Sequence, residues 1–83
     1  MKHARKDYNR IQDPENKIPA DEPVFLIRGQ DLAAPNALRA YAFEAHRMGA
    51  EPHLIEATLR HAREMEDWQR DRARKTPDMP RLR

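Results

Sequence analysis

The side chains best suited to binding a ligand gather where an apolar run meets the start of an expected helix. Arg28, Gln30 and Asp31 follow the run at residues 24–27, and Arg39 comes eight residues after Asp31. The first turn of a helix offers free N–H groups and a partial positive charge, and both favour anions. Arginine adds charge, while amide and carboxylate groups can hydrogen-bond base edges or sugar hydroxyls. This cluster predicts a site for an anionic, nucleotide-like ligand.

The same turn has a purely structural interpretation. Arg28 could pair with Asp31, and Gln30 could satisfy backbone groups of the loop. The chain has only two glycines and therefore no glycine-rich phosphate loop. Tyr8, from the arm of a neighbouring copy, could stack on a base, but an arm tyrosine could also pack against its own domain. The sequence leaves both interpretations open.

Other kinds of chemistry find little support in the sequence. The chain has no cysteine and four histidines, of which His53 and His61 are eight residues apart. Along a helix that separation is about 12 Å, too far for one shared ion. The chain has no serine either, and Thr58 and Thr76 are its only hydroxyl residues besides tyrosine. We therefore expect a non-enzymatic protein with no metal site and no cofactor.

The composition limits the chain to one small domain. Its 83 residues include 16 basic and 14 acidic side chains, a net charge of +2. No apolar run is long enough to span a membrane, so we expect no membrane contact. The basic residues near both ends could hold a nucleic-acid backbone, which makes nucleic-acid binding a third alternative. Acidic residues interleave with the basic ones along the second half, however, and this mixed surface argues against it.

The pattern of apolar residues, prolines and glycines predicts a small α-rich α+β fold with one short strand and a two-helix hairpin. Pro35 and Pro52 suit the first turns of two helices, and Gly49 suits the left-handed end of the first. The predicted parts are an extended arm at 1–23, a strand at 24–28, helices at 35–48 and 52–74, and an extended tail at 75–83.

The predicted strand needs a partner, because unpaired buried backbone groups cost about 1–3 kcal/mol each. One solution pairs it with part of the arm, such as Lys17-Ile18. The other pairs it with the same strand of a second copy across a two-fold axis. We expect a homo-oligomer, a dimer or higher, because the helices also have few strong hydrophobes for a core of their own.

A longer stretch of the chain resembles a family of small uncharacterised proteins of tailed phages and prophages. The resemblance covers about residues 18–80, with the helices matched only loosely. It implies an accessory protein in the cytoplasm of a bacterial host, and it implies no catalytic residue. It is carried by Ile18–Asp31 (IPADEPVFLIRGQD), Ala34-Pro35, Leu38–Ala42 and Lys75–Pro80.

Two functions follow from this reading of the sequence. The first is capture of an anionic, nucleotide-like ligand in an oligomeric pocket, a function that would suit counter-defence. The pocket would be formed by Arg28, Gln30, Asp31 and Arg39, with Tyr8 from a neighbouring arm. The alternative is a protein–protein inhibitor of a host factor that contacts its target through the second helix and the tail. Met65 and Trp68 would be its anchors, unless Trp68 covers the core of the hairpin.

Overall fold

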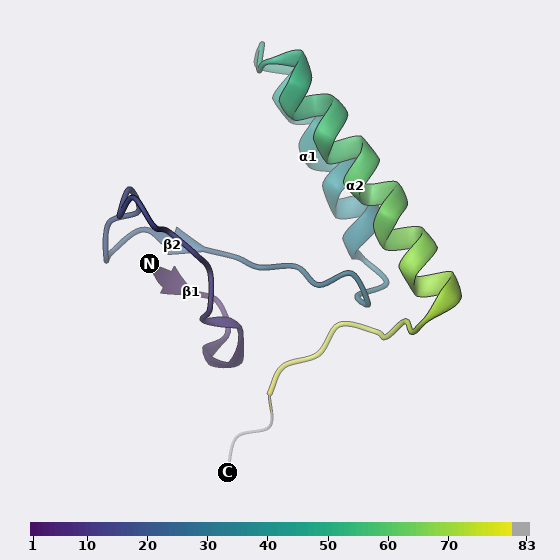
Figure 1. Cartoon of the computed structure of the whole chain (residues 1–83), viewed down its shortest axis with the longest axis horizontal. Coiled ribbons are helices and arrows are strands. Elements are labelled where there is room, and N and C mark those ends of the chain that lie inside the picture. The colour runs from purple at the N-terminus through teal and green to yellow at the C-terminus, as the bar shows by residue number, and fades with distance from the viewer. Residues whose placement is uncertain (81–83) are drawn as a thin grey trace. The chain divides into compact units, whose positions relative to one another are not determined.

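The computed structural model describes residues 1–80, which form a small α-rich α+β fold as predicted (Figure 1). None of the helices among these residues is long and apolar enough to cross a membrane. The predicted tail at 75–83 lies partly outside the described residues, because the description stops at residue 80. The elements are β1 (Lys2–His3), the 3-10 turn η1 (Lys6–Tyr8), β2 (Pro23–Val24), α1 (Ala34–Arg47) and α2 (Pro52–Asp71).

The chain forms two compact units, where the sequence analysis treats it as one domain. One unit consists of Met1–Ile27 and, among the described residues, 78–80, and it holds β1, η1 and β2. The other consists of Arg28–Pro77 and holds the two helices.

The helices form a tight hairpin, as their sequence signals predict. Gly49 has a φ of 81°, in the left-handed region that glycine adopts without strain. The amides of Gly49 and Ala50 donate to the carbonyls of His46 and Ala45, at 3.0 and 2.9 Å, which closes the end of α1. Pro35 and Pro52 both lie in the first turn of a helix. The two short-range signals, proline at the start and glycine after the end, therefore place both helices correctly.

The second helix ends at Asp71, three residues before the predicted end at residue 74. Arg72 has left the helical region, with φ −123° and ψ −72°. The chain beyond it instead pairs with the segment that leads into α1, through an isolated parallel bridge between Asp31 and Lys75. A tertiary contact thus stops the helix before its local propensity would.

Small side chains form the interior of the hairpin. Its buried hydrophobic residues are alanines, together with Pro35, and no large side chain of the described residues is fully buried. Alanine lets two helices approach closely but buries little apolar surface. Leu38, Ile55 and Met65 are half-buried beside the alanines, and the hairpin leaves its other large apolar side chains exposed. The buried alanines are Ala34, Ala42, Ala45 and Ala62.

The predicted strand at 24–28 is wrong in its extent, because the paired part of β2 ends at Val24. Its partner belongs to the same chain, but it is β1 rather than Lys17-Ile18. The two strands are parallel, with Lys2 opposite Pro23 and His3 opposite Val24. The chain turns into η1 soon after β1, so no strand within residues 1–80 continues beside residues 25–27.

Lys17 and Ile18 cannot serve as the partner because their amides are engaged elsewhere. Both donate to the Asp13 carboxylate, at 2.9 Å each. This bonding closes a turn in which Asn16 has a φ of 52°, a conformation that asparagine tolerates better than most residues.

Candidate functional site

Asp31, predicted as a ligand-binding residue, organises the start of α1. Its carboxylate Oδ1 accepts the Ala33 amide at 2.8 Å, and its carbonyl accepts the Ala34 amide at 2.9 Å. The carboxylate thereby occupies a donor that an anion at this helix start would use. Asp31 thus has a structural role at the turn, through its own carboxylate and carbonyl.

Two residues that the sequence analysis did not single out brace the same turn. The Gln69 amide nitrogen Nε2 donates to the carbonyls of Gly29 and Asp31, at 2.9 and 2.7 Å. The Lys75 amide donates to the Gln30 carbonyl at 2.7 Å, and the Lys75 carbonyl accepts the Leu32 amide at 2.9 Å.

A sequence signal for Gln69 exists. It follows Ala62 by seven residues and so lies on the buried stripe of α2, where a polar side chain needs a hydrogen-bond partner. Lys75 has no such signal, because its contribution comes from the backbone.

Arg39 is engaged across the hairpin rather than at the turn. Its Nη2 donates to the Glu66 carboxylate, and its Nη1 donates to Asn36 Oδ1 at 3.2 Å. The hydrogen bond from Arg39 lowers the pKa of the Glu66 carboxyl below its ordinary value, and the charges of Arg39 and Arg63 act in the same direction. Arg39 therefore ties α1 to α2.

Tyr8 lies on η1, in the other unit. The Arg5 guanidinium carbon sits 4.0 Å from the centre of the Tyr8 ring, a cation–π contact that covers one ring face. Arg5 is itself held by the Asp7 carboxylate, at 2.6 and 3.0 Å, and by the Asp78 carbonyl at 2.7 Å. Of the predicted site residues, only Arg28, Gln30 and Asp31 thus share one turn.

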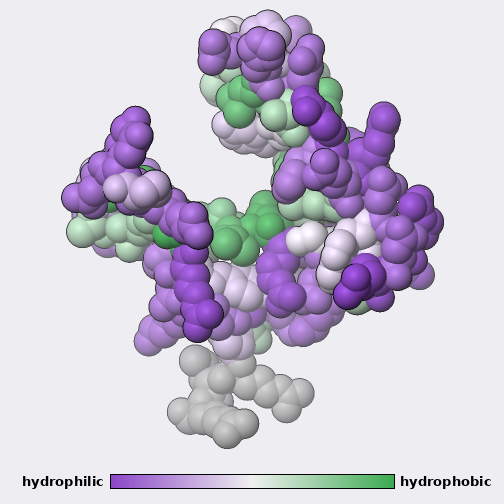
Figure 2. All heavy atoms as spheres, viewed as in Figure 1, coloured by the Kyte–Doolittle hydropathy of each residue, from purple (hydrophilic) through white to green (hydrophobic). Residues whose placement is uncertain are grey.

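A different candidate site follows β2 directly. Residues 25–27, which we call the strand extension, continue from β2 without coiling into a helix (Figure 1). Phe25 is 70% exposed, although an unbroken apolar run in a strand favours cover on both faces. Figure 2 shows hydrophobic residues gathered where the chain leaves β2. Among the described residues, no backbone hydrogen bond joins residues 25–27 to another segment.

The hydrogen bonds of β2 show which edge of the strand extension is open. The carbonyls of Glu22 and Val24 accept the amides of Lys2 and Ala4, at 2.7 and 3.2 Å, and so face β1. Backbone groups of successive residues in an extended strand point to alternate edges. The groups of Phe25 and Ile27 therefore belong to the edge away from β1.

No group of three or more histidine, aspartate or glutamate side chains in the described part of the chain could hold a metal ion. Comparison with protein-family models, with curated proteins and with solved structures finds no match to this chain. Its function is therefore inferred from the geometry of its own residues.

Proposed function

We propose that this chain is a non-enzymatic protein-binding module that captures an extended segment of another protein by strand addition. The partner segment would lie along the strand extension, on the edge of β2 away from β1. One observation supports this proposal. Residues 25–27 form an apolar, extended run that continues from β2, and their backbone groups form no backbone hydrogen bonds among the described residues.

The chemistry of this edge sets the kind of partner. The N–H and C=O groups of Phe25 and Ile27, with the Pro23 carbonyl, offer main-chain hydrogen bonds that any extended peptide can form. Pro23 has no N–H, so the partner meets an acceptor but no donor at that position. Side chains alternate along a strand, so Phe25 and Ile27 share one side. An apolar segment would cover them best, and the phage resemblance suggests a segment of a host protein.

Capture of a nucleotide-like anion at the turn before α1 has weaker support. Asp31 already occupies a donor at the helix start, and Arg39 is paired with Glu66. An anion there would have to displace one carboxylate and draw Arg39 away from another. Strand addition at residues 25–27 breaks no backbone hydrogen bond among the described residues.

A matched pair of proline variants tests the proposal. Ile27→Pro removes a backbone donor on the open edge, whereas Leu26→Pro removes a donor on the opposite edge. Leucine and isoleucine are isomers, so both variants lose a side chain of the same size. Peptides selected from a displayed random library against the unmodified protein serve as the probe.

We expect Leu26→Pro to bind the selected peptides nearly as well as the unmodified protein. Ile27→Pro should bind them at least about tenfold more weakly, because it leaves a peptide carbonyl without its donor. Amide exchange gives a second readout, since bound peptide should slow exchange at Phe25 and Ile27 but not at Leu26. Selection of no peptide, or an equal loss from both prolines, would overturn the proposal.

A further inference from the structure

The large apolar side chains of the hairpin lie mainly along one of its flanks. Tyr41 and Met48 are seven residues apart in and just after α1, and Leu54 and Trp68 are fourteen apart in α2. Spacings of seven return to nearly the same helix face. These four residues, which we call the apolar flank, are between 41% and 74% exposed.

The Arg39–Glu66 pair shows that the apolar flank is shared by both helices. At 100° per residue, Tyr41 lies about 100° to one side of buried Ala42, and Arg39 lies about 60° to the other side. Relative to buried Ala62, Leu54 and Trp68 lie about 80° and 120° to one side, and Glu66 lies about 40° to the other. Because Arg39 and Glu66 meet, they lie on the same flank of the hairpin. The side of α1 that carries Tyr41 and the side of α2 that carries Leu54 and Trp68 therefore form the opposite flank together.

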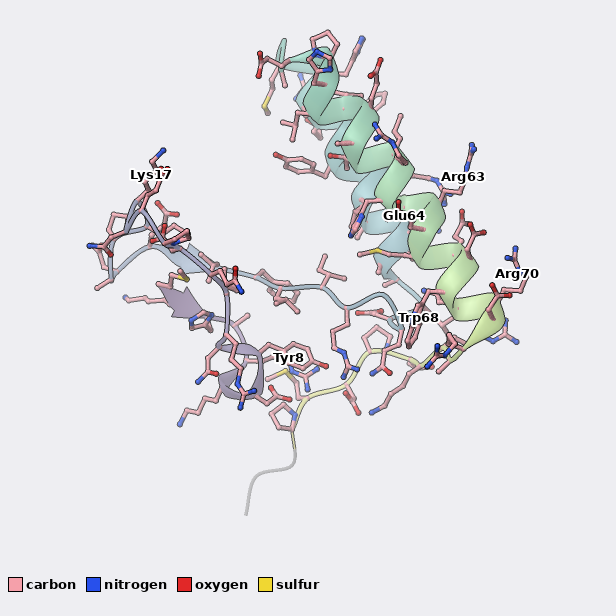
Figure 3. All side chains as sticks on the ribbon, viewed as in Figure 1. Tyr8, Lys17, Arg63, Glu64, Trp68 and Arg70 are labelled. Carbon is pink, nitrogen blue, oxygen red and sulfur yellow. The ribbon has the colours of Figure 1, made fainter. Side chains whose placement is uncertain are left out.

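The rest of the surface of α2 is unlike the apolar flank. Trp68 leaves α2 on the side away from Arg63 and Arg70 (Figure 3). The charged surface carries pairs within the helix, such as Arg70 with Asp67 at 3.3 Å. Such a charged surface stays in water. Two further large apolar side chains, Phe43 and Leu59, are exposed on the flank of the Arg39–Glu66 pair, against four on the apolar flank.

The exposed area of the flank fits a second copy of the chain. A fully exposed aromatic side chain presents about 150–250 Å², and we take a similar area for methionine and leucine. The four side chains of the flank are roughly half exposed, so together they offer about 400 Å² per copy and about 800 Å² in a pair. The helix surface between them, including Ala37 and Ala57, takes the total to the roughly 1,000 Å² expected of a specific interface. A second copy would add the apolar burial that the alanine interior lacks, because the hairpin fully buries no large side chain of its own.

We propose that two copies pack apolar flank against apolar flank around a two-fold axis, which gives a four-helix arrangement. The same surface serves both copies, as a two-fold interface requires. His61 lies midway between Leu54 and Trp68, seven residues from each, and its Nδ1 is 3.0 Å from a Glu64 carboxylate oxygen. A single polar residue within an apolar seam can fix the register of packed helices. This inference does not rest on the proposed function, which uses residues of the other unit.

Two leucines of α2 give a matched test. Leu54 is 43% exposed on the apolar flank, and Leu59 is 46% exposed on the flank of the Arg39–Glu66 pair. Sedimentation equilibrium of the full chain should give about twice the monomer mass of 9.8 kDa. We expect Leu54→Glu to weaken association at least about tenfold, because it buries a charge without a partner, and Leu59→Glu to change it less than about threefold.

A second pair in α1 keeps the test decisive if Leu54→Glu loses helix content by circular dichroism. Tyr41, on the apolar flank, is 56% exposed, and Phe43, on the other flank, is 68% exposed. Tyr41→Glu should favour the monomer, and Phe43→Glu should not. An unmodified chain that stays monomeric at all concentrations, or equal effects from the two flanks, would overturn the inference.

Discussion

At the scale of single residues, side-chain amides and carboxylates hold the backbone in place. Asp31 bonds to the amide of Ala33, and Gln69 reaches from α2 to two carbonyls of the segment before α1. Gln69 fastens this segment to α2 by two hydrogen bonds, to the carbonyls of Gly29 and Asp31. It therefore couples the position of the turn to the hairpin.

We expect Gln69→Ala to destabilise the hairpin by about 1–3 kcal/mol. The substitution leaves the carbonyls of Gly29 and Asp31 without their side-chain donor in a partly buried position. Urea unfolding followed by circular dichroism measures the change. Glu64→Ala is the control, because Glu64 is exposed on the same helix and pairs only with His61 among the described contacts. A change equally small in both variants would show that Gln69 does not hold the turn.

The binding role predicted for the turn could not be judged from residue types alone. An aspartate just before a helix can contact a ligand or bond to its own loop, so Asp31 allowed two interpretations. The structure adds a contact that residue types do not specify, from the Ala33 amide to the Asp31 carboxylate. Arg39 was placed at the turn because its helical position brings it near, while its actual partner, Glu66, is distant in sequence.

At the scale of elements, the two helices could be predicted because residues near their ends determine where they begin and end. Proline in the first turn and glycine after the last turn act within a few residues. The strand could not be predicted in the same way, because β2 pairs with a segment twenty-one residues earlier in the chain. An apolar run such as 24–27 indicates that burial of its side chains is favourable, but it does not indicate which segment covers them.

The turn between the helices provides a prediction at this scale. We expect Gly49→Ala to destabilise the chain by about 1–2 kcal/mol, because a φ of 81° brings a side-chain carbon close to the following carbonyl. Thermal unfolding at fixed protein concentration measures the loss.

The other glycine supplies the control. Gly29 has no positive φ, and a Cβ built there would lie 3.8 Å from Met65 Cγ, an ordinary contact distance. Gly29→Ala should therefore be nearly neutral or slightly stabilising. Equal destabilisation by both substitutions would show that backbone strain at Gly49 is not the cause.

At the scale of the whole molecule, the two proposals assign different surfaces to the two units. The strand extension belongs to the unit with β1 and β2, and the apolar flank belongs to the helical hairpin. A two-fold dimer would carry two strand extensions. A partner with two matching segments would then bind more tightly than one segment binds, provided that both extensions can be reached together.

Association also makes a prediction about thermal stability that no single surface contact does. If the apolar flank closes only in the dimer, folding and association are linked, and the unfolding temperature must rise with protein concentration. A tenfold increase in concentration is worth about 0.7 kcal/mol per chain, or about 3–6 °C for a chain of this size. Calorimetric scans over about a hundredfold range of concentration measure the shift. Leu59→Glu should keep this dependence, whereas Leu54→Glu should lose it and unfold at one temperature throughout. A shift that persists in Leu54→Glu would place the association on some other surface of the chain.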